Sequence, residues 1–176
     1  NLSNKFPIIQ KNINFYNSAF LNKISLRYIV LCEDLFVSKI NTGGIPDTEK
    51  RTLILDINFN VKYFERMIHH EIFHMIQKSN MEIFDESRFS SLNDVNFKYA
   101  ECSTCSDRLN LDLYNDTNGF LTEYSKSIAS EDMAEIFSFL MTDKTNIEAL
   151  IKKDKILEKK VTFIKSGILK IDKNIL

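Results

Sequence analysis

The chain has 176 residues, a length typical of one domain with a substantial hydrophobic core. Its 23 Lys and Arg against 24 Asp and Glu give a formal net charge of −1, which excludes a polybasic nucleic-acid binder because phosphate contacts need surplus positive charge. A hydrophobic content of 44% with 14 Phe excludes an acidic disordered chain. With only four Gly and two Pro, the composition favours long helices and a modest sheet.

The first third of the chain is expected to contain a helix followed by strands. Apolar residues at helical spacing predict a helix over Phe6–Leu21, with Pro7 in its first turn. The β-branched and aromatic stretch Ile24–Val37 predicts one long strand or two short ones. The Gly/Pro cluster Asn41–Asp47 predicts a loop, and Thr52–Asn58 predicts a compact strand.

The remainder is expected to be mostly helical. Val61–Lys78 is the clearest helix, and Asn80–Gly119 is weakly periodic and predicts a long irregular region. A second helix is expected over Ser130–Met141, with Ser130 as N-cap. A third is expected over Asn146–Ile171, with its lysines on a solvated face. These elements predict a single α+β domain over residues 1–176, a small mixed sheet packed on helices, and no membrane span.

The chemical signal of the sequence is a cluster of histidines. His70-Glu-Ile-Phe-His74 is an HExxH motif on the clearest predicted helix. Residues four apart lie one turn apart on the same side of a helix, so both imidazoles can reach one metal ion, and Glu71 can hold a metal-activated water. His69 lies about 100° round the helix from His70, which favours a surface or packing role, or less readily a substrate contact.

The apolar pattern of this helix adds weight to the motif. Glu71 occupies a position where the apolar stripe predicts a core residue, and a carboxylate there is costly unless it has a cation or a polarised water as partner. The alternative is that Glu71 extends to solvent from the edge of the stripe while His70 and His74 are ordinary half-buried rings.

A catalytic zinc site needs a third protein ligand. A metzincin would supply a histidine at position 80, but this chain has Asn80 there, so a carboxylate or thiolate is expected. Glu131 and Glu135 lie one turn apart on the second predicted helix, so one could bind the metal and the other could accept the free ring N–H of a ligand histidine. Alternatively, both are solvated acids near the positive end of a helix.

The residues of two segments resemble the gluzincin metallopeptidases, and within them the anthrax lethal factor catalytic domain family. The matching residues are the HExxH motif and the stretch from Leu121-Thr-Glu-Tyr124 to Glu131-Asp-Met-Ala-Glu135-Ile-Phe137. The resemblance implies a zincin-like fold with an HExxH active-site helix and a second, Glu-bearing helix. It implies Zn²⁺ held by His70, His74 and Glu131, with Glu135 as partner of a zinc-bound histidine.

The same resemblance implies the reaction of an endopeptidase. Glu71 would act as general base on a metal-activated water, and Tyr124 would direct its phenol at the developing oxyanion. A peptide or protein substrate would lie along an edge strand near Leu53–Ile57. The likeness favours a secreted or cell-envelope protein, and a monomer that binds no nucleic acid is expected.

Two other functions are compatible with the same residues. One is a metal-binding pseudo-protease that serves as a protein-binding module, and the other is a zinc hydrolase of a non-peptide amide bond. Cys102 and Cys105 form a C-x-x-C without a second pair, which is typical of ordinary thiols or one short disulfide rather than a structural zinc site.

Overall fold

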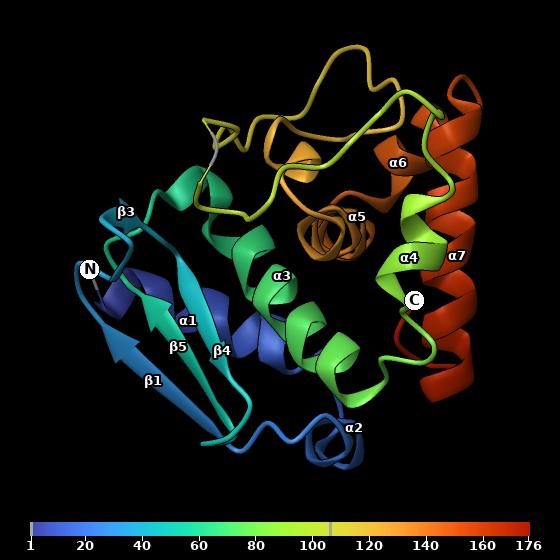
Figure 1. Ribbon diagram of the computed structural model, residues 1–176. Helices are drawn as coiled ribbons and strands as arrows, with labels where there is room; N and C mark the ends of the chain where they lie inside the picture. The colour runs from blue at the N-terminus through green and yellow to red at the C-terminus, as the bar shows by residue number, and fades with distance from the viewer. Residues whose placement is uncertain (1, 106) are drawn as a thin grey trace. The chain divides into compact units, whose positions relative to one another are not determined.

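The computed structural model describes residues 2–105 and 107–176 of the chain. It divides into two compact units, one formed by Asn1–Asn80 with Ile175 and the other by Met81–Asn174 with Leu176. The expectation of one domain over residues 1–176 stays a prediction. Among the described residues there are seven α-helices and a small sheet, so the α+β class is confirmed (Figure 1).

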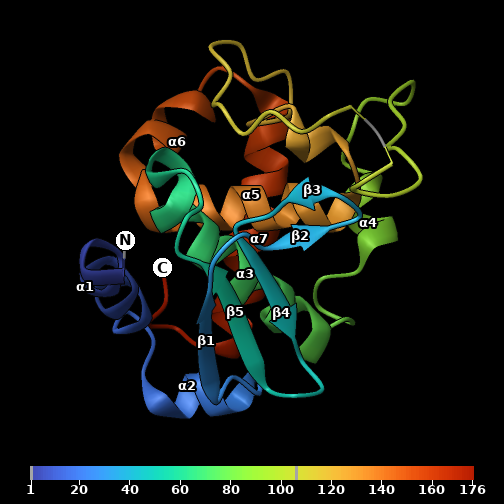
Figure 2. The ribbon, with the colours of Figure 1, turned by 90° about the vertical axis from the view of Figure 1, so that its left-hand side faces the viewer.

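The first unit is built on a three-stranded mixed sheet. Its strands are β1 (Tyr28–Cys32), β5 (Thr52–Asp56) and β4 (Gly44–Asp47), in the order β1-β5-β4. β1 is parallel to β5 and β4 is antiparallel to it, so the predicted small mixed sheet is confirmed (Figure 2). The short strands β2 (Phe36–Val37) and β3 (Ile40–Asn41) form a separate hairpin, so Ile24–Val37 contains two strands.

Two predictions about these strands are wrong. The strand near Leu53–Ile57 is not an edge strand, because Leu53 pairs with Ile29 on one side and with Pro46 on the other. The edge strands are β1 and β4, and β4 lies inside the segment Asn41–Asp47 that the Gly/Pro cluster predicts as a loop. A proline is compatible with an edge strand because its missing N–H can face away from the neighbouring strand.

Three helices complete the first unit: α1 (Leu2–Ile13), α2 (Ser18–Lys23) and α3 (Val61–Ser79). The single helix predicted over Phe6–Leu21 is therefore two, because the side chain of Asn17 caps α2 by accepting the N–H of Phe20 at 2.9 Å. Pro7 lies inside α1 rather than in its first turn, since the helix begins at Leu2. α3 packs on α1, β4 and β5, as its predicted apolar stripe requires.

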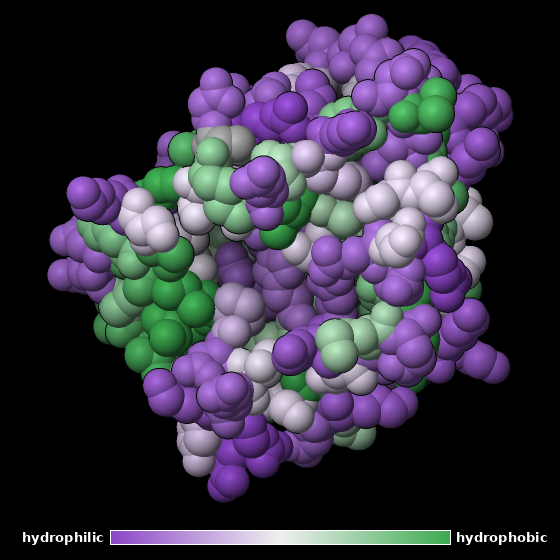
Figure 3. Space-filling model, viewed as in Figure 1, coloured by the Kyte–Doolittle hydropathy of each residue, from purple (hydrophilic) through white to green (hydrophobic). Residues whose placement is uncertain are grey.

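The strands of this sheet have one buried side and one more open side. Leu53 and Leu55 of β5 are completely buried, whereas Ile54 between them is half-buried. Ile54 lies in register with Val30 of β1, which is 46% exposed, and with half-buried Ile45 of β4. Figure 3 shows a hydrophobic area over these strands. α3 therefore covers the Leu53/Leu55 side of the sheet.

The second unit is helical and contains a long irregular segment. Its helices are α4 (Glu86–Ser90), the 3₁₀ helix η1 (Tyr124–Lys126), α5 (Ala129–Thr142), α6 (Lys144–Leu150) and α7 (Lys155–Ile171). α5 is central, since it packs on the other four helices. The predicted irregular region Asn80–Gly119 contains only the short α4 among its described residues.

Local capping explains where the helices of this unit differ from prediction. The helix predicted over Asn146–Ile171 is interrupted at Asp154, whose side chain accepts the N–H groups of Ile156 and Leu157 at 3.0 and 2.9 Å. Ser130 is not the N-cap of α5; that position is Ile128, which makes no side-chain capping bond.

Of the two alternatives for Cys102 and Cys105, ordinary thiols or one short disulfide, the structure contains the disulfide. Cys32 is a free thiol and is half-buried. Of the helices in the described part of the chain, none combines the length and the apolar character that crossing a membrane requires.

One carboxylate organises the turn at the end of the central strand. Asp56 is completely buried and accepts the N–H groups of Asp34 and Asn58 on Oδ1 and that of Leu35 on Oδ2, at 2.8 to 3.2 Å. Its Oδ2 also accepts the side-chain amide of Asn41 at 3.1 Å. Burial by itself would raise the pKa of Asp56, but these hydrogen bonds to the charged form bring it below its ordinary value.

We expect Asp56→Asn to destabilise the protein in a pH-dependent way. Because the folded-state pKa lies below that of the unfolded chain, about 3.9, the charged carboxylate stabilises the fold above that pH. The contribution disappears as the pH falls through the folded-state value. Chemical denaturation at pH 7 should show a loss of about 2–3 kcal/mol, since a buried charged acceptor is removed. Exposed Asp116→Asn is the control, and a loss that stays constant down to pH 2 would contradict the assignment.

Candidate metal centre

Two histidine rings face each other on one side of α3. The Nε2 atoms of His70 and His74 are 3.2 Å apart, and the ring centroids are 4.9 Å apart in an edge-to-face arrangement. His70 is buried, and His74 is half-buried. The one-turn spacing predicted from the HExxH motif therefore brings two metal-binding nitrogens together.

The spacing of these nitrogens fits a shared metal ion. Zinc binds imidazole nitrogen at about 2.0–2.1 Å with tetrahedral angles, which places two such nitrogens about 3.3 Å apart. Two neutral rings at this distance each direct a lone pair or an N–H toward the other, and a cation between them satisfies both lone pairs. The donor pair His70 and His74 thus fits zinc in both atom type and separation.

His69 has a different environment from its neighbours. It is completely buried, with Nδ1 2.6 Å from the hydroxyl of Tyr16 and Nε2 2.8 Å from Oδ1 of Asn12. The amide oxygen requires a ring N–H at Nε2, so Tyr16 donates to Nδ1 of a neutral ring. Burial lowers the pKa of His69 to about 4, against the opposing charge of Glu65. The packing interpretation is confirmed, and the surface and substrate-contact interpretations are wrong.

These contacts fix the rotation of α3 about its own axis. Asn12 donates its amide to Glu65 at 3.1 Å, and Lys11 forms an ion pair with the same carboxylate at 2.8 Å. α1 therefore holds α3 at Glu65 and at His69. Since His70 follows His69 by about 100° of helix rotation, holding His69 also sets the direction of the His70 ring.

Glu71 lies against the backbone of the edge strand. Its side chain is 7% exposed, so the alternative that it extends to solvent is wrong. A Cβ atom added at Gly44 of β4 would lie 2.7 Å from Cγ of Glu71 and 2.9 Å from Sδ of Met67. Such contacts are too short for a real side chain, so glycine at this position lets the strand pass directly beside Glu71.

The free edge of β4 lies beside this carboxylate. The carbonyl oxygen of Gly43 accepts the N–H of Asp56 at 2.9 Å, so Gly43 faces the sheet. Because backbone groups alternate along a strand, Gly44 and Pro46 face the other edge. Among the described residues, β4 has no further strand on that edge. Sequence reasoning missed Gly44, because a glycine pair next to a proline is also typical of a loop.

In the second unit, α5 carries both predicted acidic residues. Glu131 is 8% exposed and Glu135 1% exposed, and the two lie one helical turn apart. The alternative that they are solvated acids at the start of a helix is therefore wrong. Buried carboxylates are costly, so each needs hydrogen bonds or positive charge nearby.

Thr122 provides one such hydrogen bond within the second unit. Its hydroxyl donates to Oε2 of Glu135 at 2.8 Å and accepts the N–H of Ser125 at 3.1 Å, and Thr122 and Ser125 are completely buried. The turn that begins η1 therefore holds the Glu135 carboxylate in a fixed position. The sequence analysis includes the Leu121-Thr-Glu-Tyr124 segment in the resemblance but assigns no role to Thr122. The available signal was a hydroxyl residue a few positions before the helix that carries Glu131 and Glu135, because a buried carboxylate needs a hydrogen-bond donor.

Tyr124 is the first residue of η1 and is half-buried. Its N–H donates to the carbonyl oxygen of Asn110 at 3.0 Å, and its carbonyl oxygen accepts the hydroxyl of Ser127 at 2.7 Å. The backbone position of Tyr124 is thus fixed on both sides by the second unit.

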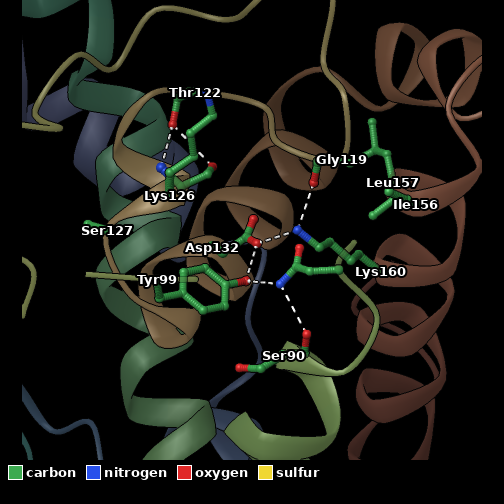
Figure 4. Close-up of polar contacts among 12 residues, drawn as sticks. Ser90, Tyr99, Gly119, Thr122, Lys126, Ser127, Asp132, Ile156, Leu157 and Lys160 are labelled. Atoms are coloured by element: carbon green, nitrogen blue, oxygen red, sulfur yellow. Dashed lines mark hydrogen bonds and ion pairs between the residues drawn. The ribbon is translucent and has the colours of Figure 1, made fainter. Parts of the chain in front are cut away.

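A buried ion pair adjoins Glu131 in sequence. Asp132 and Lys160 are both completely buried, with Nζ 2.6 Å from Oδ2 (Figure 4). Burial raises the pKa of Asp132 to about 6, against the opposing charge of Lys160, and burial also lowers the pKa of Lys160. The prediction of a solvated lysine face on the C-terminal helix is therefore wrong for Lys160, which lies on the apolar stripe of α7, three residues after Leu157 and four before Ile164.

Comparison with protein families finds one match. Residues 39–171, which include α3 and α5, match the family described as "Putative zinc-binding metallo-peptidase". No match was found among curated proteins or among solved structures. The match spans well over half of the chain, and zinc is the metal that the family binds. The chain therefore belongs to this family of zinc-binding metallopeptidases.

Proposed function

We propose that this protein is a zinc endopeptidase of the gluzincin type, with a zincin-like fold. The observation that carries the proposal is the pair of Nε2 atoms of His70 and His74, 3.2 Å apart on the helix that also carries buried Glu71. The family match supports a metallopeptidase in general. The proposal extends to the metal ligands, the general base and the substrate-binding strand.

Glu131 is the third ligand in this proposal. Two imidazole nitrogens and one carboxylate oxygen form a donor set that can hold a metal ion and that suits a catalytic zinc. Burial of Glu131 is compatible with this role, because a metal ion is one of the partners that can stabilise a buried carboxylate. When bound, the zinc ion would supply a water of lowered pKa and polarise the scissile carbonyl.

Glu71 acts as the general base. It accepts a proton from the attacking water and returns it to the leaving amine, so one carboxylate serves both halves of the reaction. Its position against Gly44 restricts its rotation, which keeps the carboxylate oriented for both transfers. The phenol of Tyr124 donates to the oxyanion that forms when the carbonyl is attacked.

Glu135 orients a ligand histidine. A carboxylate that accepts the remaining ring N–H fixes the tautomer and makes the other nitrogen a better ligand. The hydrogen bond from Thr122 fixes that carboxylate in turn. The arrangement explains why the turn before η1 is completely buried at Thr122 and Ser125.

The substrate is a peptide segment that adds a strand to β4. Backbone groups of Gly44 and Pro46 face the free edge of β4, and an extended peptide can pair with such an edge. The edge passes beside Glu71, so a peptide bound there lies next to the general base. β4 thus replaces the strand near Leu53–Ile57 as the proposed substrate-binding strand.

The role of Glu71 is tested by Glu71→Gln. The substitution keeps the shape of the side chain but removes its basicity, so zinc should stay bound while hydrolysis of a peptide library falls by about 10²–10⁴. Elemental analysis and mass spectrometry of the products measure the two quantities. Glu82→Gln, on an exposed residue after α3, is the control. Undiminished turnover of Glu71→Gln would exclude Glu71 as the base.

The role of Tyr124 is tested by Tyr124→Phe. Loss of one good oxyanion donor typically lowers the rate by about 10²–10³, and the effect belongs to the transition state. We therefore expect kcat to fall far more than KM changes. Tyr28→Phe, on an exposed residue of β1, controls for the loss of a phenol. A change confined to KM would show that Tyr124 binds substrate in the ground state instead.

The role of Thr122 is tested by Thr122→Val. This change removes the hydroxyl that bonds Glu135 while keeping the volume of the side chain. Removing the direct partner of a ligand histidine typically weakens metal binding 10–100-fold. Thr122 supports that partner rather than the histidine, so we expect a loss at the lower end, about 10-fold, in a chelator competition with zinc. Thr142→Val, which removes a hydroxyl bonded to a carbonyl oxygen of α5, is the matched control. Equal affinities of the two variants would refute the role.

A further inference from the structure

A polar cluster around a buried ion pair in the second unit has no place in the chemistry described so far. The cluster consists of Tyr99, Asp132 and Lys160. The hydroxyl of Tyr99 donates to Oδ2 of Asp132 at 2.7 Å, and Nζ of Lys160 donates to the same oxygen at 2.6 Å. Figure 4 shows the phenol and the ammonium reaching this carboxylate from different elements. One carboxylate oxygen therefore joins α5, α7 and the irregular segment.

Stability alone gives a weak reason for such a cluster. Asp132 and Lys160 are both completely buried, and desolvating two charges costs about as much as their attraction returns. Well-packed apolar residues of similar volume often give equal or greater stability. Oδ1 of Asp132 is buried without a hydrogen-bond partner among the described residues, which adds to the cost. The geometry that the cluster holds is a second explanation for its presence.

The geometry that the cluster holds is the first turn of α5. The N-cap of this helix, Ile128, makes no side-chain capping bond, so the first turn lacks the usual local support. Asp132 lies in that turn, directly after Glu131. The N–H of Ala100, next to Tyr99, also donates to the carbonyl oxygen of Ser127 at 2.7 Å. Tyr99 and Ala100 thus fasten the turn and the residues that lead into it.

Lys160 also fixes the segment that carries Thr122 and Tyr124. Its Nζ donates to the carbonyl oxygen of Gly119 at 2.8 Å and lies 3.6 Å from the ring centroid of Phe120. Asp154, the N-cap of α7, holds the same turn by accepting the N–H of Gly119 at 2.5 Å. One ammonium group of α7 therefore bonds to the Glu-bearing turn and to the chain that leads into the Thr122–Tyr124 segment.

We propose that Lys160, with Asp132 and Tyr99, is a positioning device that holds Glu131 in its metal-binding orientation and aligns it with the Thr122–Tyr124 segment. The proposal rests on the proposed function of Glu131 as zinc ligand. None of the three residues touches the metal or the substrate in this proposal; they act through the first turn of α5.

The test replaces the ion pair with apolar residues of similar size, Asp132→Leu/Lys160→Met. Zinc affinity, measured on the full chain by chelator competition with zinc alone, should fall about 10–100-fold, as for other losses of ligand support. Stability in denaturant is measured beside it, because the loss of two desolvation costs is offset by the Tyr99 hydroxyl and the Gly119 carbonyl oxygen, which lose these partners. The control is Ile168→Ala, which creates a cavity at a buried position of α7, about two turns from Lys160. It should lower stability and leave zinc affinity unchanged.

Two further variants separate this inference from the ligand assignment. Glu131→Gln alone should weaken zinc binding strongly, and if it does not, the proposed function of Glu131 fails. If Glu131→Gln weakens binding but the apolar double variant does not, only the positioning role fails. In the Glu131→Gln background the apolar replacement should have little further effect on affinity, and an undiminished effect there would show that it acts through the fold in general. If the double variant does not fold, Tyr99→Phe, which removes one hydroxyl, takes its place. Its effect on zinc affinity is then compared between the unchanged protein and the Glu131→Gln background.

Discussion

Two imidazole nitrogens 3.2 Å apart on one helix are the constraint on which the rest of the structure depends. Such a separation is energetically favourable only when a proton or a metal ion lies between the two nitrogens, because their lone pairs otherwise repel each other. The helix repeat brings the rings to the same side, but it does not fix the direction in which that side faces. Tyr16 and Asn12 fix it, because they bind both nitrogens of His69 and thereby hold α3 against α1.

The second constraint is the closeness of a strand to the same helix. A helix and a strand normally keep their side chains between them, but at Gly44 nothing separates the strand backbone from Glu71 and Met67. Any larger residue would force β4 away from α3. The cost of glycine is conformational entropy in the unfolded chain, and edge strands tolerate this residue when close approach is required. The edge strand and the carboxylate are thereby brought together.

The sequence predicted well those features that depend on periodicity. α3 and β5 were predicted nearly to their ends, since a strong apolar stripe and a short apolar run each specify one kind of element. Features that depend on a single side chain were not predicted. Asn17 and Asp154 each start a new helix by accepting backbone N–H groups, and composition alone does not tell such a cap from an ordinary surface residue.

The site follows the same division. The spacing of His70, Glu71 and His74 was readable because helix geometry converts it directly into a shared face. The partners that come from distant segments, such as Thr122 for Glu135, were not readable, because only the tertiary fold brings them within 2.8 Å. The role of Gly44 was not predicted for the opposite reason. The glycine pair close to a proline is visible in the sequence, but this pattern is equally typical of a loop.

The charges buried in α5 connect these observations. Three carboxylates, Glu131, Asp132 and Glu135, are buried within five residues of one helix, and like charges at this spacing repel each other. Lys160 offsets Asp132 within the second unit, and Thr122 gives Glu135 a hydrogen bond but no charge. In the proposed site a divalent cation would add positive charge close to this helix and would attract both glutamates at once. In the proposal, α5 would therefore contribute to the metal site through its negative charge as well as through Glu131 as ligand.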